Sequence, residues 1–157
     1  AWNISLADLQ EVANINTGNL FPATIKSMED TIKGIVMDTP IKGGENISDD
    51  DFSLLLNPSY YNDNASMYVL TNKQGINGAS CLLYEDLIRS FADKLQSDLY
   101  ILPSSIHELI LIPTQNNGDR SSLKEMVVEV NLTQVAPEEV LSDNVYYFNR
   151  KQNAIIL

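Results

Sequence analysis

Two uninterrupted apolar runs, Leu99–Leu102 and Leu109–Ile112, constrain the fold of this chain more than any other sequence feature. A strand with one face in water alternates apolar and polar residues, whereas a strand covered on both faces reads as a continuous apolar run. The two runs therefore predict interior strands, and we expect the hydrophobic core to be built on the stretch from Asp98 to Pro113.

The segment between the two runs predicts a turn at the rim of the sheet. Pro103 fixes φ and suits a turn, and Ser104 and Ser105 can hydrogen-bond to nearby backbone. Ser105 and Glu108 also have the spacing of a capping box, which predicts one helical turn from Ser105 to Glu108. His107, the only histidine of the chain, is thus expected at the rim beside Glu108.

The other patterns predict helices and strands on both sides of this stretch. Apolar residues at helical spacing predict helices over 6–16, after a cap at Ser27, over 87–95, and from Asp119 or Ser122 to Asn131. Short apolar runs bounded by turn residues predict a hairpin of two strands, 67–72 and 76–84, and a terminal hairpin over 145–148 and 154–157. A single helical turn is expected over 135–141.

Hairpins that alternate with helices predict an α+β fold. We expect an antiparallel sheet of about six strands with helices packed mainly on one face, and two further N-terminal helices. The 157 residues, 44% of them hydrophobic, are enough for one domain. Within it we expect a helical segment at 1–37, a polar acidic connector at 38–66, and a core of sheet and helices at 67–157.

The charge of the chain argues against two classes of partner. Its 21 acidic and 10 basic residues give a formal charge of −11, which repels nucleic-acid phosphates and anionic lipid surfaces. No apolar run approaches the roughly 18 residues that span a bilayer, and no secretory signal pattern is present. Cys81 is the only cysteine, so it cannot form an internal disulfide, and we expect a cytoplasmic protein.

His107 invites a metal-binding interpretation that the rest of the sequence does not support. A zincin motif needs a second histidine four residues later, where this chain has Leu111. With no other histidine, zinc would need three carboxylates or Cys81, which is an unusual ligand set. The Asp49–Asp51 run lacks the central glycine and the final glutamate of a calcium-binding EF-hand loop. We therefore predict no metal site and no cofactor.

Acid–base or nucleophilic catalysis stays open, because a catalytic triad is recognised by geometry and not by spacing along the chain. The candidate catalytic residues are His107 and the groups that could assist it, namely Glu108, Asp98, Ser104 and Ser105. Tyrosine is enriched at the centres of protein interfaces, since it combines a large apolar ring with a polar tip. The candidate binding residues are Tyr60, Tyr61 and Tyr147.

Several motifs spread over nearly the whole chain resemble a family of uncharacterised bacterial proteins. They are Leu20-Phe21-Pro22, Met67-Tyr-Val-Leu-Thr-Asn72, Leu102-Pro-Ser-Ser-Ile-His-Glu108 and Pro137-Glu-Glu-Val-Leu-Ser-Asp143. The resemblance implies a domain of unknown function whose members carry a further N-terminal region, so that this chain would be the C-terminal half of such a protein. It implies no activity, cofactor or catalytic residue.

The leading prediction is a non-catalytic binding or protein-interaction module, whose partner is a protein and could be its own N-terminal region. The alternative is a hydrolase-like enzyme that uses His107 with Glu108 or Asp98. An enzyme should bring His107, a serine or cysteine, and a carboxylate within hydrogen-bond reach around a pocket. An interaction module should instead tie His107 to backbone and expose an apolar patch.

Overall fold

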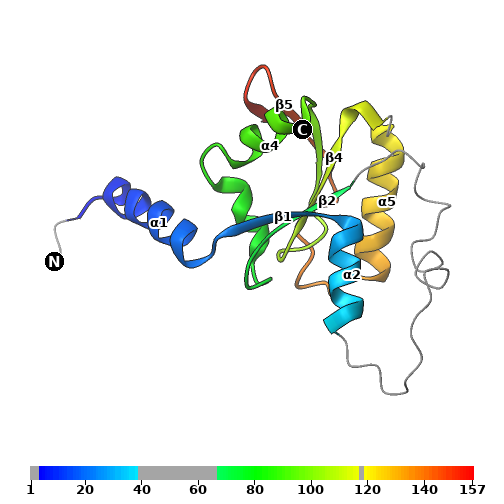
Figure 1. Cartoon of the computed structure of the whole chain (residues 1–157), viewed down its shortest axis with the longest axis horizontal. Helices are drawn as coiled ribbons and strands as arrows, with labels where there is room; N and C mark the ends of the chain where they lie inside the picture. Colours follow the sequence, from blue (N-terminus) through cyan, green and yellow to red (C-terminus); the bar gives the residue numbers. More distant parts are fainter. Residues whose placement is uncertain (1–3, 39–66, 117–118) are drawn as a thin grey trace.

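The computed structural model describes residues 4–38, 67–116 and 119–157, and a six-stranded antiparallel sheet lies at its centre (Figure 1). The strand order is β1-β2-β4-β3-β5-β6, and neighbouring strands are antiparallel throughout. The strands are β1 (Ala23–Ser27), β2 (Tyr68–Asn72), β3 (Leu99–Leu102), β4 (Leu109–Pro113), β5 (Tyr146–Asn149) and β6 (Ala154–Ile156). β3 and β4 form the middle pair, which confirms the two predicted interior strands.

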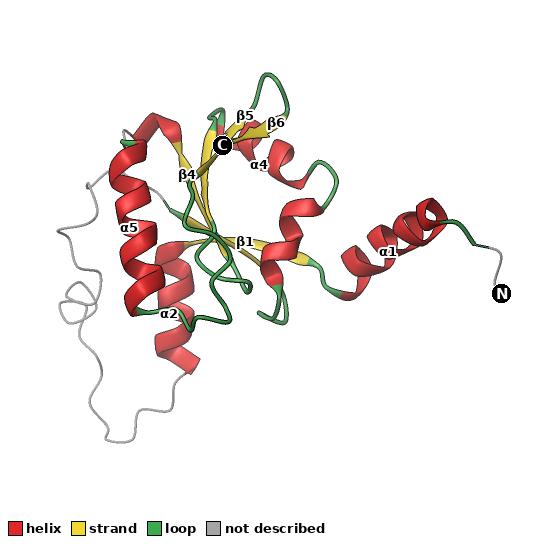
Figure 2. Ribbon diagram, turned by 180° about the vertical axis from the view of Figure 1, so that it is seen from behind, coloured by secondary structure: helices red, strands yellow, loops and turns green. Residues whose placement is uncertain are grey.

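Helices cover both faces of the sheet (Figures 1 and 2). α2 (Met28–Asp38) and α5 (Arg120–Thr133) lie side by side on one face, whereas α4 (Leu87–Leu95) and the 3-10 helix η2 (Gly78–Leu83) pack on the other. The α+β class with an antiparallel six-stranded sheet is confirmed. α2 and α5 share one face, in line with the prediction, but the opposite face is covered as well. The remaining helices are α1 (Leu6–Leu20) and the 3-10 turn η3 (Thr114–Asn116).

The alternation of side chains along the central strands explains why both faces are covered. Leu99 and Ile101 of β3 point toward α4, while Leu102 points toward α5. The cluster on the α4 face consists of Leu70, Ala79, Cys81, Ile88, Ala92, Leu99, Ile101, Leu109, Leu111 and Phe148. The cluster on the α5 face consists of Met67, Leu102, Ile112, Leu123, Val127 and Val145. The stretch from Asp98 to Pro113 thus supplies residues to both clusters, as expected.

The predicted strand over 76–84 is wrong, and the place beside β2 is taken by β1 instead. Residues 23–27 were expected to lie within a helical segment, but they pair along the whole of β2, from Ala23 opposite Asn72 to Ser27 opposite Tyr68. With one edge of β2 bonded to β1 and the other to β4, no edge is left for residues 76–84. They form η2 and pack Ala79 and Cys81 against one face of the sheet.

Several predicted ends of helices also differ from the structure. α1 continues past the predicted end at residue 16 to Leu20, and α5 continues past Asn131 to Thr133, with Asn131 buried. The helical turn predicted at Ser105 is absent, because the Ser105 hydroxyl accepts from the amide of His107 two residues on. Over 135–141 only a turn forms, closed by the amide of residue 139 bonding to the carbonyl of residue 136.

Two predicted helix features are confirmed. The Ser27 hydroxyl accepts a hydrogen bond of 3.0 Å from the amide of Asp30 and so caps α2. The range 87–95 is the range of α4, with Ile88 and Ala92 buried. The connector at 38–66, with Asp49–Asp51 and two of the candidate tyrosines, lies outside the described residues except for its first position.

Candidate functional site

His107 lies in the loop between β3 and β4, and each of its ring nitrogens lies close to a polar group. Its Nδ1 accepts a hydrogen bond of 3.0 Å from the backbone amide of Asn77, and its Nε2 lies 3.4 Å from Oε1 of Glu139. Because an amide can only donate, Nδ1 must be the unprotonated nitrogen, and the ring proton of the neutral imidazole belongs on Nε2. The imidazole therefore joins the start of η2 to the turn that precedes β5.

The backbone around His107 is held from the same two sides. The Thr71 hydroxyl donates to the carbonyl of His107 over 2.8 Å, and the amide of Ala79 donates to the carbonyl of Ile106. On the other side, the amide of Ile106 donates to the carbonyl of Glu139 over 3.0 Å. Three chain segments that are distant in sequence thus meet at this loop and are joined by hydrogen bonds.

Gly78 makes this junction possible. A Cβ atom at this position would collide with the Thr71 hydroxyl and the His107 carbonyl, and would lie 2.8 Å from the amide nitrogen of Asn72. Two of these three atoms belong to the backbone, so they cannot move aside as a flexible side chain would. Glycine at position 78 therefore sets how closely η2 approaches the loop that carries His107.

The two candidate serines are bonded to backbone near His107. The Ser104 hydroxyl donates to the carbonyl of Glu108 over 3.1 Å, and the Ser105 hydroxyl accepts from the amide of His107 over 3.0 Å. Within the described part of the chain, neither hydroxyl is hydrogen-bonded to the imidazole. The carboxylate at the imidazole is that of Glu139, not that of the neighbouring Glu108.

Asp98 lies at the opposite end of β3 from His107. The four residues of the strand, at about 3.3 Å each, separate the two ends by roughly 13 Å, which is too far for a hydrogen bond. Asp98 instead accepts a hydrogen bond of 2.6 Å from the Tyr147 hydroxyl and one of 2.8 Å from the amide of Arg150. The structure thus places Asp98 with Tyr147, another candidate, and apart from the histidine.

These contacts shift the pKa of Asp98 and that of Tyr147. The Tyr147 hydroxyl, followed by the Arg150 amide, lowers the pKa of Asp98 because both stabilise its charged form. The same contact with Asp98 raises the pKa of Tyr147 to about 12, with a smaller effect of burial. The Tyr147 ring also lies 5.8 Å from the ring of Tyr100, centroid to centroid.

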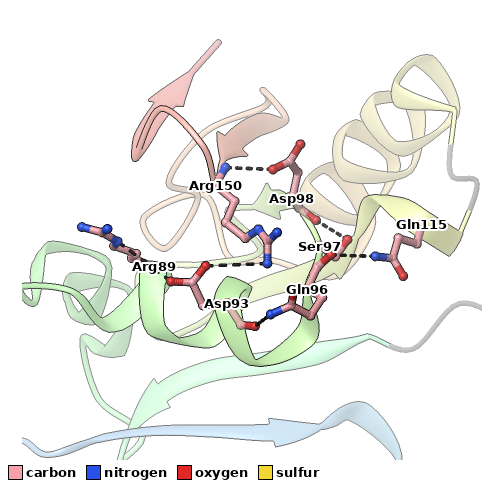
Figure 3. A network of polar contacts seen from close by, with 7 residues as sticks. All are labelled: Arg89, Asp93, Gln96, Ser97, Asp98, Gln115 and Arg150. Atoms are coloured by element: carbon pink, nitrogen blue, oxygen red, sulfur yellow. Dashed lines mark hydrogen bonds and ion pairs between the residues drawn. The ribbon is translucent and has the colours of Figure 1, made fainter.

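Figure 3 shows how Asp98 belongs to a polar network at the end of α4. Arg150 bonds to Asp98 through its amide, and its guanidinium lies 3.7 Å from Asp93, which in turn lies 3.9 Å from Arg89. The side-chain amide of Gln115 donates to the backbone carbonyl of Gln96, which is the C-cap of α4. Each charged group drawn here has a partner, so the network ties α4 to the β5–β6 turn.

Sequence reasoning missed Glu139 and Asn77, which make the two contacts of the imidazole. Glu139 lies in the Pro-Glu-Glu motif quoted for the family resemblance, but no local spacing connects it with a histidine so far away in the chain. Tyr60 and Tyr61 lie outside the described residues. Cys81 is fully buried, and this burial raises the pKa of its thiol.

The described residues contain no group of three His, Cys, Asp or Glu side chains that could hold a metal ion. Along the same residues, no helix has both the length and the apolar character needed to cross a bilayer.

Besides the loop that carries His107, the helix α1 is a second candidate site, because it has an exposed apolar face. None of the residues of α1 is buried, and its apolar side chains face solvent, with 81% of Leu6 and 53% of Leu9 exposed. The helix extends away from the sheet in both views (Figures 1 and 2). It is held at its C-terminal end by two hydrogen bonds. The Tyr84 hydroxyl donates to the carbonyl of Phe21 over 2.8 Å, and the side-chain amide of Gln74 donates to the carbonyl of Leu20.

Residues 1–150 match DUF5688, described as a family of unknown function. No curated protein and no solved structure matches the chain.

Proposed function

The chain belongs to DUF5688, a family of unknown function, and from this premise we propose that it is a non-catalytic protein-interaction module. We further propose that it forms the C-terminal half of a larger bacterial protein of the cytoplasm. The exposed apolar face of α1 carries the proposal. Its partner is the preceding region of the same protein, as the resemblance of the motifs implies.

The length and composition of α1 support a partner for this face. Isolated helices of about 12–15 residues are marginal in water, and α1 has 15 residues. Asn14, Asn16 and Gly18 are poor helix formers. The capping box of Ser5 and Asp8 supports only the first turn. A partner that buries the apolar face would stabilise the helix by about 1.5–3 kcal/mol for each large side chain covered.

The contacts of His107 favour this reading over the hydrolase-like alternative. A general base needs a free lone pair directed at the substrate. In this structure the Nδ1 lone pair receives the Asn77 amide, and Nε2 lies 3.4 Å from Oε1 of Glu139. The serines nearby are bonded to backbone, and Asp98 lies at the other end of β3.

Site-specific photo-crosslinking in the natural protein tests the proposal. A photoreactive phenylalanine analogue at Leu9 should cross-link to protein, with peptides of the preceding region identified by mass spectrometry. The control is the same substitution at Leu132 of α5, which is 80% exposed and should give a lower yield. Equal yields from the two positions would refute a contact surface on α1.

Substitution of the same face separates binding from folding. Leu9→Asp should leave the stability of this chain within about 0.5 kcal/mol, since exposed positions tolerate change. The same substitution should weaken association between this chain and the separately expressed preceding region by about 100-fold, as expected for a buried interface leucine. If Leu9→Asp unfolds the chain, the face is already covered within it, and the proposal is wrong.

A further inference from the structure

The two edges of the sheet differ in how they are protected against pairing with another strand. Exposed edges usually carry a charge or a proline that prevents such pairing. β1 has Lys26 exposed within the strand and Pro22 just before it. β6 consists of Ala154, Ile155 and Ile156, and the two isoleucines are 42% and 47% exposed. No strand lies beyond β6 in the described part of the chain, so its edge is open and carries no charge.

A surface cavity lies beside β6 on the α4 face of the sheet. It has a volume of about 290 Å³, and its apolar wall includes Leu82, Leu87, Phe148 and Ile155. Ile155 pairs with Phe148 across the β5–β6 ladder, so the two side chains share this face. The cavity is large enough for one branched apolar side chain of a neighbouring strand.

A second cavity of about 300 Å³ lies beside the first turn of α5 and is basic. Arg120 and Lys124 line it together with Asn144 and Leu157, and no acidic side chain among the described residues does so. The Arg120 guanidinium donates to the carbonyl of Val145 over 2.9 Å, which fixes it across the cavity. Lys124 forms no ion pair with the described residues. In a chain with 21 acidic and 10 basic residues, this cavity is a local exception that favours a carboxylate.

We propose that β6 binds an extended acidic segment of another protein by strand addition. The backbone of the segment pairs with β6, and its side chains alternate between the two faces. Apolar side chains then occupy the cavity on the α4 face, and the carboxylates between them lie toward Arg120 and Lys124. This site shares no residue with the α1 face and does not depend on its function.

The charges favour such a segment over a second copy of this chain. If β6 paired with β6 of a second copy about a two-fold axis, the two Arg120 and Lys124 cavities would lie on the same face next to the junction. Like charges brought together across an interface cost several kcal/mol, whereas an acidic strand complements the cavity.

NMR titration of the isotope-labelled chain with two synthetic peptides tests the proposal. One blocked peptide alternates leucine and glutamate, and the other has lysine in place of each glutamate. The glutamate peptide should shift the amide resonances of residues 154–157 and 120–124 and slow hydrogen exchange in β6. The lysine peptide should bind at least about tenfold more weakly.

Matched variants assign the effect to the edge and to the cavity. Lys124→Glu should weaken the glutamate peptide about tenfold, while Lys73→Glu, an equal change of charge at an exposed turn, should not. Ile156→Lys should block binding as an edge lysine does, and Leu132→Lys should leave it unchanged. Three results would overturn the proposal: equal binding of the two peptides, shifts confined to other residues, or a dimer in sedimentation that Ile156→Lys dissociates.

Discussion

Replacing Gly78 by alanine tests the junction between η2 and the loop that carries His107. The added methyl group would collide with the Thr71 hydroxyl and the His107 carbonyl, and would lie 2.8 Å from the amide nitrogen of Asn72. It would have to separate η2 from the loop. The separation would stretch the hydrogen bonds that join η2 and its N-cap residue to the loop, from the Ala79 amide to the Ile106 carbonyl over 3.2 Å and from the Asn77 amide to His107 over 3.0 Å.

The size of the effect follows from these contacts. Forcing an extra carbon into a well-packed site costs about 1–3 kcal/mol. Losing one of the hydrogen bonds between η2 and the loop adds about 0.5–1.5 kcal/mol. Gly78→Ala should therefore lower the free energy of unfolding by about 2–4 kcal/mol. At about 2–4 °C per kcal/mol for a chain of this length, the melting temperature should fall by roughly 5–15 °C.

Urea denaturation followed by circular dichroism measures this change, and Gly34→Ala is the matched control. Gly34 lies within α2 and is exposed, and a Cβ atom added there would meet no described atom beyond its own helix within 4 Å. Alanine at this position should raise the free energy of unfolding by about 0.5–1 kcal/mol, since glycine is a poor helix former. A Gly78→Ala protein as stable as the wild type would show that η2 does not pack closely on the loop.

Three further predictions concern the polar contacts. Tyr147→Phe should remove the tyrosine whose pKa is raised to about 12 from an ultraviolet absorbance titration. Because the folded pKa of Tyr147 is raised, the stability that its contact with Asp98 provides should be complete below about pH 10 and lost as pH rises through 12. A difference in stability between variant and wild type that does not change with pH would contradict this prediction. Asn131→Asp should lower the free energy of unfolding in urea by about 2–4 kcal/mol, because Nδ2 of Asn131 donates to Asp143. Adding Asp143→Asn should restore at least half of the lost free energy, and no restoration would show that the two side chains are not in contact. Long-range proton–nitrogen correlation should show that the neutral imidazole of His107 carries its proton on Nε2, and a proton on Nδ1 would refute its contact with the backbone.

The parts of the fold that could be predicted are those with a strong local signal. The continuous apolar runs of β3 and β4 reflect burial on both faces, which no alternative element of that length explains as well. In α4, Leu87, Ile88, Phe91, Ala92 and Leu95 recur at helical spacing, and the helix has the predicted range. In both cases the residues that determine the element lie within it.

The parts that could not be predicted depend on partners far away in the chain. β1 contains only five residues and is a strand because it pairs with β2, with Ala23 opposite Asn72. Residues 76–84 look like a strand because small and apolar residues suit a buried strand as well as a 3-10 helix. Once β1 and β4 occupy both edges of β2, only packing on a face of the sheet remains for them.

The same reasoning applies to the contacts of the candidate site. The motif around His107 suggested Glu108 as the neighbouring carboxylate, because adjacent residues are the only partners that sequence spacing can identify. Glu108 immediately precedes β4, whereas Glu139 belongs to a turn that the loop meets through the bond from the Ile106 amide. The backbone bond brings the Glu139 side chain to the imidazole. Its identity follows from the tertiary fold, and sequence spacing could not have given it.

The hydrogen-bonded junction at His107 and the exposed apolar surfaces are two physically different parts of the molecule. Around His107, three chain segments are joined by hydrogen bonds, one of which the Nδ1 atom of the imidazole accepts. Exposed apolar side chains gather on α1 and on the edge of β6, in addition to single exposed positions such as Leu83 and Leu132. Exposed apolar elements at the periphery of a hydrogen-bonded centre support the proposed interaction module.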